Sequence, residues 1–144
     1  MVTLLVTLLA CAPDLPEGWE TAERVTDFAQ TPCDKANTNT FYGSVTSDGN
    51  SVTIEAQPVS ARCDQALEGW WQATGSGGGE LLVQPVDMDP ASVGKCDCGP
   101  VAVSFRVPTT TLSTFDVYKR DDRHGTDDPQ PYLLGEVGVL DFVD

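Results

Sequence analysis

The sequence predicts an all-β protein that folds as an antiparallel β-sandwich of about seven or eight short strands. Three observations support this class. Short runs of β-branched and aromatic residues recur from residue 40 onwards, turn signals separate these runs, and no long segment has a helical repeat of apolar residues. A small β-barrel is the alternative architecture.

The first segment, residues 19–30, is ambiguous. Ala22, Val25 and Phe28 form a weak helical stripe, but the segment is short and is equally compatible with an extended conformation. We therefore assign it no strand.

The next two runs predict a β-hairpin. Residues 41–46 and 51–59 are rich in alternating apolar residues, and the cluster between them contains Asp48 and Gly49. An Asp-Gly pair between two β-runs is a strong hairpin signal because glycine accepts the positive φ that the tight turn requires.

The rest of the chain continues the pattern. The clearest alternation in the sequence places Val101, Val103, Phe105 and Val107 on one face, which predicts a strand with these side chains in the core. Further strands are expected on either side of it, the last segment holding one or two, at residues 67–74, 80–86, 115–119 and 132–143.

The charge excludes one class of partner. The chain has 22 acidic and 8 basic residues, for a formal net charge of −14. Such a surface repels phosphate backbones, so nucleic-acid binding is not expected. It favours solubility, and it is also compatible with affinity for cations or basic partners.

Cys11 follows Leu8, Leu9 and Ala10 at the end of a short apolar leader. This run resembles the lipobox of bacterial lipoproteins. The resemblance implies that residues 1–10 are a cleaved signal peptide and that Cys11 becomes the lipid-carrying N-terminus, with acyl chains such as palmitate as the membrane anchor.

The same resemblance gives a location and a domain plan. Ala12, rather than an aspartate, follows the cysteine, which favours the outer membrane of the bacterial cell envelope. We expect residues 11–30 to be the acylated N-terminus and a tether, and residues 31–144 to form a single β domain.

Once Cys11 is set aside, an even number of cysteines remains. In an exported protein this predicts two disulfide bonds, which suit an immunoglobulin-like sandwich. Because a bridge between positions 96 and 98 would close a very tight ring, each should pair with Cys33 or Cys63. The alternative is a thiol-redox pair or a soft-metal site at positions 96 and 98. The cysteines concerned are Cys33, Cys63, Cys96 and Cys98.

Trp70 and Trp71 are candidate partner-binding residues. Adjacent residues of a strand face opposite ways, so one tryptophan should enter the core and the other should face outwards. The outward indole would bind a protein or a glycan, unless another strand or loop covers it.

The loop that carries the only histidine, His124, is acidic. A lone histidine in a loop without a paired nucleophile does not predict an enzyme. Four aspartates make the loop a weak calcium candidate, although the spacing is not that of an EF-hand and a solvated acidic loop is the simpler interpretation. The candidates are Asp121, Asp122, Asp127 and Asp128.

Together these observations predict a lipid-anchored protein of the bacterial envelope with a non-catalytic binding or structural β-sandwich and no required cofactor. An envelope thiol-redox enzyme using Cys96 and Cys98 is one alternative, and a calcium-stabilised adhesion module is another. The expected partners are the membrane, through the lipid, and an unidentified protein or glycan.

Overall fold

The structure is a computed structural model. It describes residues 14–32, 40–61, 65–75, 77–87, 100–108, 111–121 and 129–138. In these residues it contains nine β-strands and no helix: β1 (Glu23–Arg24), β2 (Thr26–Gln30), β3 (Tyr42–Ser47), β4 (Val52–Val59), β5 (Leu67–Ala73), β6 (Gly79–Pro85), β7 (Val101–Val107), β8 (Thr114–Lys119) and β9 (Tyr132–Gly138).

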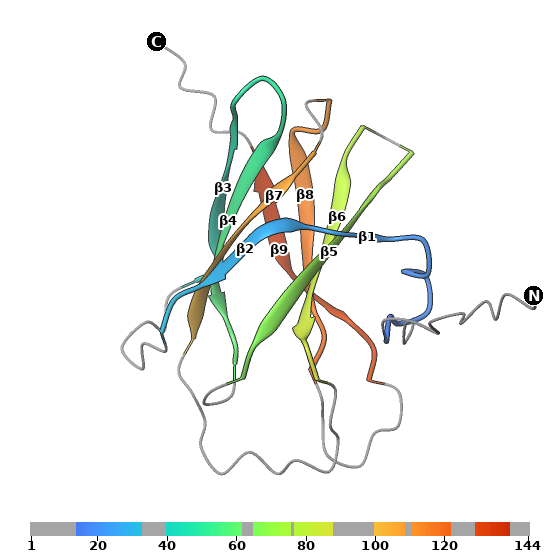
Figure 1. Ribbon diagram of the computed structural model, residues 1–144, viewed down its shortest axis with the longest axis vertical. Coiled ribbons are helices and arrows are strands. Elements are labelled where there is room, and N and C mark those ends of the chain that lie inside the picture. Colours follow the sequence, from blue (N-terminus) through green and yellow to red (C-terminus); the bar gives the residue numbers. More distant parts are fainter. Residues whose placement is uncertain are drawn as a thin grey trace, which may run out of the picture.

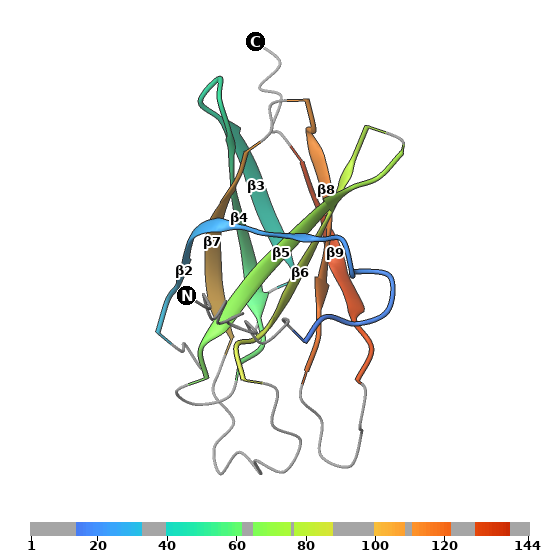
Figure 2. The same ribbon diagram turned by 45° about the vertical axis from the view of Figure 1, so that its right-hand side comes forward.

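The strands form two separate sheets, which confirms the predicted all-β sandwich. The five-stranded sheet has the order β1-β5-β6-β8-β9, and the four-stranded sheet has the order β2-β7-β4-β3. Figures 1 and 2 show the two sheets as facing layers. No hydrogen-bonded strand pair joins the two sheets in the described residues, so the fold is a sandwich and not the closed barrel that was the alternative.

Two details differ from the sequence-based prediction. The described residues hold nine strands rather than seven or eight, because residues 23–30 add β1 and β2. One pair, β6 and β8, is parallel rather than antiparallel. Between β6 and β8 the chain passes through β7, which belongs to the four-stranded sheet. It then returns to the five-stranded sheet as β8, which runs beside β6 in the same direction.

The core lies between the sheets and follows the predicted alternation. Val101, Val103, Phe105 and Val107 of β7 are each at most 1% exposed. The Phe105 ring stacks on Phe28 of β2, with ring centroids 5.9 Å apart. Burying a side chain of this size contributes about 1.5–3 kcal/mol, so this stripe is a main source of stability.

The predicted hairpin is present as β3 and β4, paired antiparallel from Tyr42↔Gln57 to Ser47↔Val52. Its turn is closed by Asp48, whose Oδ1 accepts hydrogen bonds from the backbone amides of Asn50 and Ser51 at 2.9 and 2.8 Å. This is the local side-chain-to-backbone bonding for which aspartate is favoured in turns.

Residues 14–30 belong to the sandwich instead of forming a free tether. The chain runs along the edge of one sheet as β1, passes the buried Val25, and joins the other sheet as β2 (Figure 1). Trp19 upstream is only 6% exposed. The folded unit therefore starts no later than Asp14, not near residue 31 as the sequence suggested, because apolar side chains of this segment are buried on the domain.

Candidate functional site

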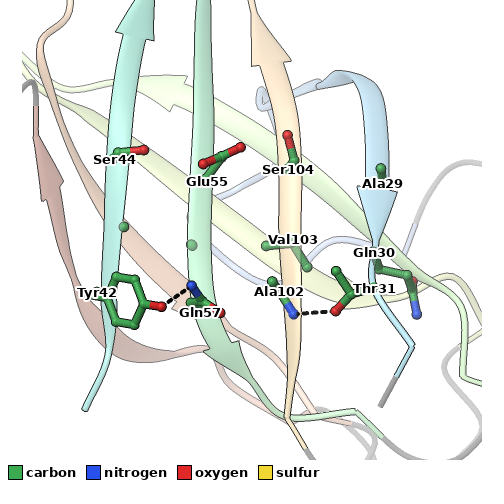
Figure 3. Close-up of a pocket in the computed structure, with 12 residues that line it drawn as sticks. Ala29, Gln30, Thr31, Tyr42, Ser44, Glu55, Gln57, Ala102, Val103 and Ser104 are labelled. Atoms are coloured by element: carbon green, nitrogen blue, oxygen red, sulfur yellow. Dashed lines mark hydrogen bonds between the residues drawn. The ribbon is translucent and has the colours of Figure 1, made fainter. Parts of the chain in front are cut away.

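A groove lies on the outer face of the four-stranded sheet. Its cavity volume is about 440 Å³. The groove is open to solvent, and strands β2, β3, β4 and β7 all contribute to its floor (Figure 3). The lining residues are Ala29, Gln30, Thr31, Tyr42, Gly43, Ser44, Glu55, Ala56, Gln57, Ala102, Val103 and Ser104.

Strand register brings the central row of the groove together. Ser44 of β3 is paired with Glu55 of β4, Glu55 with Ser104 of β7, and Ser104 with Ala29 of β2. Figure 3 shows these four side chains in one line across the sheet. Three of the four are small, and this leaves an open space around the Glu55 carboxylate.

A second row forms the adjacent part of the groove. The Nε2 of Gln57 donates a hydrogen bond to the Tyr42 hydroxyl. On the other side, the amide of Ala102 donates to Thr31 Oγ1 at 2.9 Å, and the amide of Thr31 donates to the Ala102 carbonyl at 2.9 Å. The Tyr42 ring remains 53% exposed at the end of this row.

The charges on this face are unevenly partnered. Arg106, two residues beyond Ser104 on β7, forms ion pairs with Asp48 at 3.0 Å and with Asp27 at 3.9 Å. Backbone amides of Asn50 and then Ser51 hold the pKa of Asp48 below its usual range, so this carboxylate is charged at neutral pH. Within the described part of the chain, no hydrogen bond or ion pair reaches the Glu55 carboxylate.

Residues 14–22 cover part of the outer face of the five-stranded sheet, over Trp70, Leu82 and Tyr118. Arg120 is 1% exposed, and its guanidinium donates hydrogen bonds to the carbonyls of Asp14 and Pro129 at 2.8 and 2.7 Å. Gln84 Nε2 donates to the same Asp14 carbonyl at 3.0 Å. Two buried side chains, Gln84 of β6 and Arg120, which directly follows β8, thus fix the backbone of Asp14 in place.

The two tryptophans face opposite ways, as predicted, but neither is a free outward indole. Trp71 packs against the main core, and its buried Nε1 has no hydrogen-bond partner among the described residues. Trp70 faces outwards and is 9% exposed, because Trp19 and its neighbours cover it. Its Nε1 donates to Glu68 Oε1 at 3.1 Å. The outward tryptophan, Trp70, is therefore covered by another part of the chain, which was the alternative to a binding role.

Trp19 completes this covered cluster by meeting Tyr118 edge-on, with ring centroids 5.8 Å apart. Burial raises the pKa of the Tyr118 phenol, and the charges of Glu80 and Asp116 act in the same direction. Tyr118 is therefore neutral at neutral pH and acts as a packing residue here.

Most of the other candidate residues lie outside the described residues: Cys11, Cys33, Cys63, Cys96, Cys98, Asp122, His124, Asp127 and Asp128. The disulfide, thiol-redox and lipidation predictions therefore stay predictions. Asp121 is described. Its Oδ1 accepts a hydrogen bond from buried Lys119 at 2.7 Å, and its Oδ2 accepts one from the Tyr132 hydroxyl at 2.8 Å. Both oxygens of this calcium candidate already have partners, and the described residues contain no cluster of metal-ligating side chains.

Comparisons with protein-family models, with curated proteins and with solved structures find no match to this chain. In the ranges that the structure describes, no helix has the length and apolar character of a membrane span.

The groove was not predicted from the sequence. Ser44, Glu55 and Ser104 occupy the polar positions of alternating strands, so the sequence indicates that they face outwards. Their meeting in one row depends on the pairing of β3, β4 and β7. The predicted hairpin brings β3 beside β4, but a single sequence gives no register for β7, which lies far from both in the chain.

Proposed function

We propose that this chain is a lipid-anchored protein of the bacterial cell envelope whose β-sandwich is a non-catalytic binding module. Cys11 carries the acyl anchor in this proposal, and the groove on the four-stranded sheet is the binding face. A sandwich fold by itself does not select a function, so the argument depends on how the two outer faces differ.

One observation supports this assignment most directly: the first described residue, Asp14, and the groove lie on opposite outer faces of the sandwich. Asp14 is held by Arg120 and Gln84 on the five-stranded sheet. The groove is formed by the four-stranded sheet. A chain attached at its N-terminus and binding a partner on the far side needs this separation.

The attachment to the membrane would be short. Cys11 precedes Asp14 by three residues, and an extended chain spans at most about 3.5 Å per residue, so the link reaches roughly 10 Å. The fixed Asp14 then keeps the five-stranded sheet nearer to the bilayer than the groove. A partner approaching from the aqueous side would meet the groove directly.

The open face also suits binding better than catalysis. Acid–base and nucleophilic catalysis depend on positioned donors in a site from which water is excluded. The groove is instead a solvent-exposed sheet surface with small side chains around one carboxylate. Such a surface provides contact area and a few polar anchors, which is what a binding face requires.

The anchor is tested by expressing the full chain in a Gram-negative bacterium and measuring the intact mass of membrane-extracted protein. We expect an N-terminus at Cys11 that carries acyl chains, and we expect Cys11→Ala to abolish both the modification and the membrane association. Ala12→Ser is the matched control, because it changes the neighbouring residue and keeps the cysteine. Full-length protein with an unmodified Cys11 would overturn the lipid anchor.

The same preparation separates a binding module from a thiol-redox protein. With two disulfide bonds, titration of the denatured, unreduced protein should find no free thiol. A redox pair at Cys96 and Cys98 would instead release two thiols on mild reduction while the fold, measured by circular dichroism, stays intact. That second outcome would replace the binding proposal by the redox alternative.

A further inference from the structure

We infer that the groove binds a basic side chain, lysine or arginine, presented by an extended peptide segment of a partner protein, with Glu55 as its counter-ion. The inference builds on the proposed function, because it names the ligand class of the same face. It concerns the groove alone and does not depend on the lipid at Cys11.

The negative charge of Glu55 and of the whole chain favours a basic ligand in the groove. Glu55 lies in the central row of the groove, and no ion pair to it is formed by the described residues. The nearby cation, Arg106, is directed to Asp48 and Asp27 instead. The chain as a whole carries a formal charge of −14, so its field attracts basic partners and repels acidic ones.

The two hydroxyl groups beside the Glu55 carboxylate also favour a cation. The neighbours of Glu55 in the row are Ser44 and Ser104, whose hydroxyls can each donate or accept a hydrogen bond. An ammonium or guanidinium group carries several donors and no acceptor, so it matches one carboxylate flanked by two hydroxyls. An anionic ligand would leave Glu55 facing a like charge.

The length and the lining of the groove suit an extended peptide. The groove crosses four strands, and neighbouring strands lie about 4.8 Å apart, so its length is roughly 14 Å. Four or five residues of an extended peptide have this length. Ala29 and Ala102 leave room for aliphatic groups on the β7 side of Glu55, and the exposed ring of Tyr42 offers an apolar surface on its β3 side.

The test uses the purified full-length chain and three peptides. The probe is acetyl-Ser-Val-Lys-Val-Ser-amide, and its partners carry norleucine or N-acetyl-lysine at the central position. Affinities are measured by calorimetry or by chemical-shift titration at low ionic strength. We expect the lysine peptide to bind and both neutral peptides to bind about two- to fivefold more weakly, because they lack the ion pair.

Glu55→Gln should reduce the affinity for the lysine peptide by the same factor and leave the affinity for the neutral peptides unchanged. Glu136→Gln is the matched control: it removes an exposed glutamate from β9 of the other sheet and changes the net charge equally. Ser104→Leu, which fills the groove but keeps Glu55, should weaken binding of all three peptides. Raising the ionic strength should reduce the difference in affinity between the lysine peptide and the two neutral peptides, because salt screens the ion pair.

Equal effects of Glu55→Gln and Glu136→Gln would show that binding depends on net charge alone and would overturn the inference. Equal affinity for the lysine and norleucine peptides would also overturn it, while leaving the groove as a binding face. Loss of the lipid on Cys11 with peptide binding intact would overturn the anchor and leave this inference standing.

Discussion

The outer face of the five-stranded sheet is partly covered by residues 14–22, whereas the described residues form no such layer over the outer face of the four-stranded sheet. The covered face has large side chains, such as Trp70 and Tyr118, and a buried guanidinium. The open face has alanine, serine and threonine around a groove. Both faces belong to the same two-layer sandwich.

The difference indicates that the covered face contributes mainly to stability and that the open face is available for binding. On the covered face, polar groups such as Arg120 and Gln84 are withdrawn from water and bonded to the backbone of Asp14. Such groups are costly to disturb because a broken buried hydrogen bond leaves an unsatisfied partner. On the open face, Glu55 and Tyr42 remain accessible. A partner can therefore bind there without displacing any of the residues that the structure describes.

The largest expected effect compares one aromatic side chain from each face. Trp70→Ala should reduce the free energy of unfolding by about 3–5 kcal/mol, because it empties a site that is 9% exposed beneath Trp19. Tyr42→Ala should change it by less than about 1 kcal/mol, because that ring is 53% exposed. Urea unfolding followed by circular dichroism measures both. Comparable losses would mean that the two faces do not differ in stability.

The next effect compares two arginines. Arg120→Met should cost about 2–3 kcal/mol, because the carbonyls of Asp14 and Pro129 lose a charged donor inside the protein. Limited proteolysis should then cut within residues 14–22 more rapidly than in the unchanged chain. Arg106→Met, which removes a half-exposed guanidinium from the open face, should cost no more than about 0.5 kcal/mol. Unchanged protease resistance of Arg120→Met would show that the N-terminal segment is held by its aromatic side chains alone.

Local patterns predicted the inner face of the sandwich well. The alternation along residues 101–107 places every second side chain in the core, and Asp48-Gly49 marks the turn between β3 and β4. Both signals act over a few residues, within which strand geometry and turn chemistry determine the conformation. The same short range explains why the opposite orientations of Trp70 and Trp71 were predicted.

The outer faces could not be predicted in this way. The bond from Arg120 to the Asp14 carbonyl joins residues 106 positions apart, and nothing in the local sequence of either residue indicates the other. Residues 19–30 contain apolar side chains at a spacing compatible with a helix or a strand, and tertiary packing decides in favour of β1 and β2. The row that contains Glu55 likewise arises from the register of separate strands.

The smallest effect concerns the turn beside the open face. Backbone amides of Asn50 and Ser51 hold the pKa of Asp48 below its usual range. A carboxylate whose pKa is lower in the folded state contributes stability above its unfolded-state pKa of about 3.9, and loses it as the pH falls through the folded-state pKa. Asp48→Asn should therefore be slightly less stable than the unchanged chain at pH 7, and the gap should close below about pH 4.

Asp48→Ala separates charge from hydrogen bonding at this turn. The asparagine amide oxygen can still accept from Asn50 and Ser51, whereas alanine has no acceptor, so the alanine variant should be the less stable of the two at every pH. Urea unfolding between pH 3 and pH 7 measures both gaps, and added salt should reduce the part that comes from Arg106. A gap between Asp48→Asn and the unchanged chain that widened in acid would contradict the lowered pKa. It would also remove the charged turn as the reason why Arg106 is directed to Asp48 rather than to Glu55.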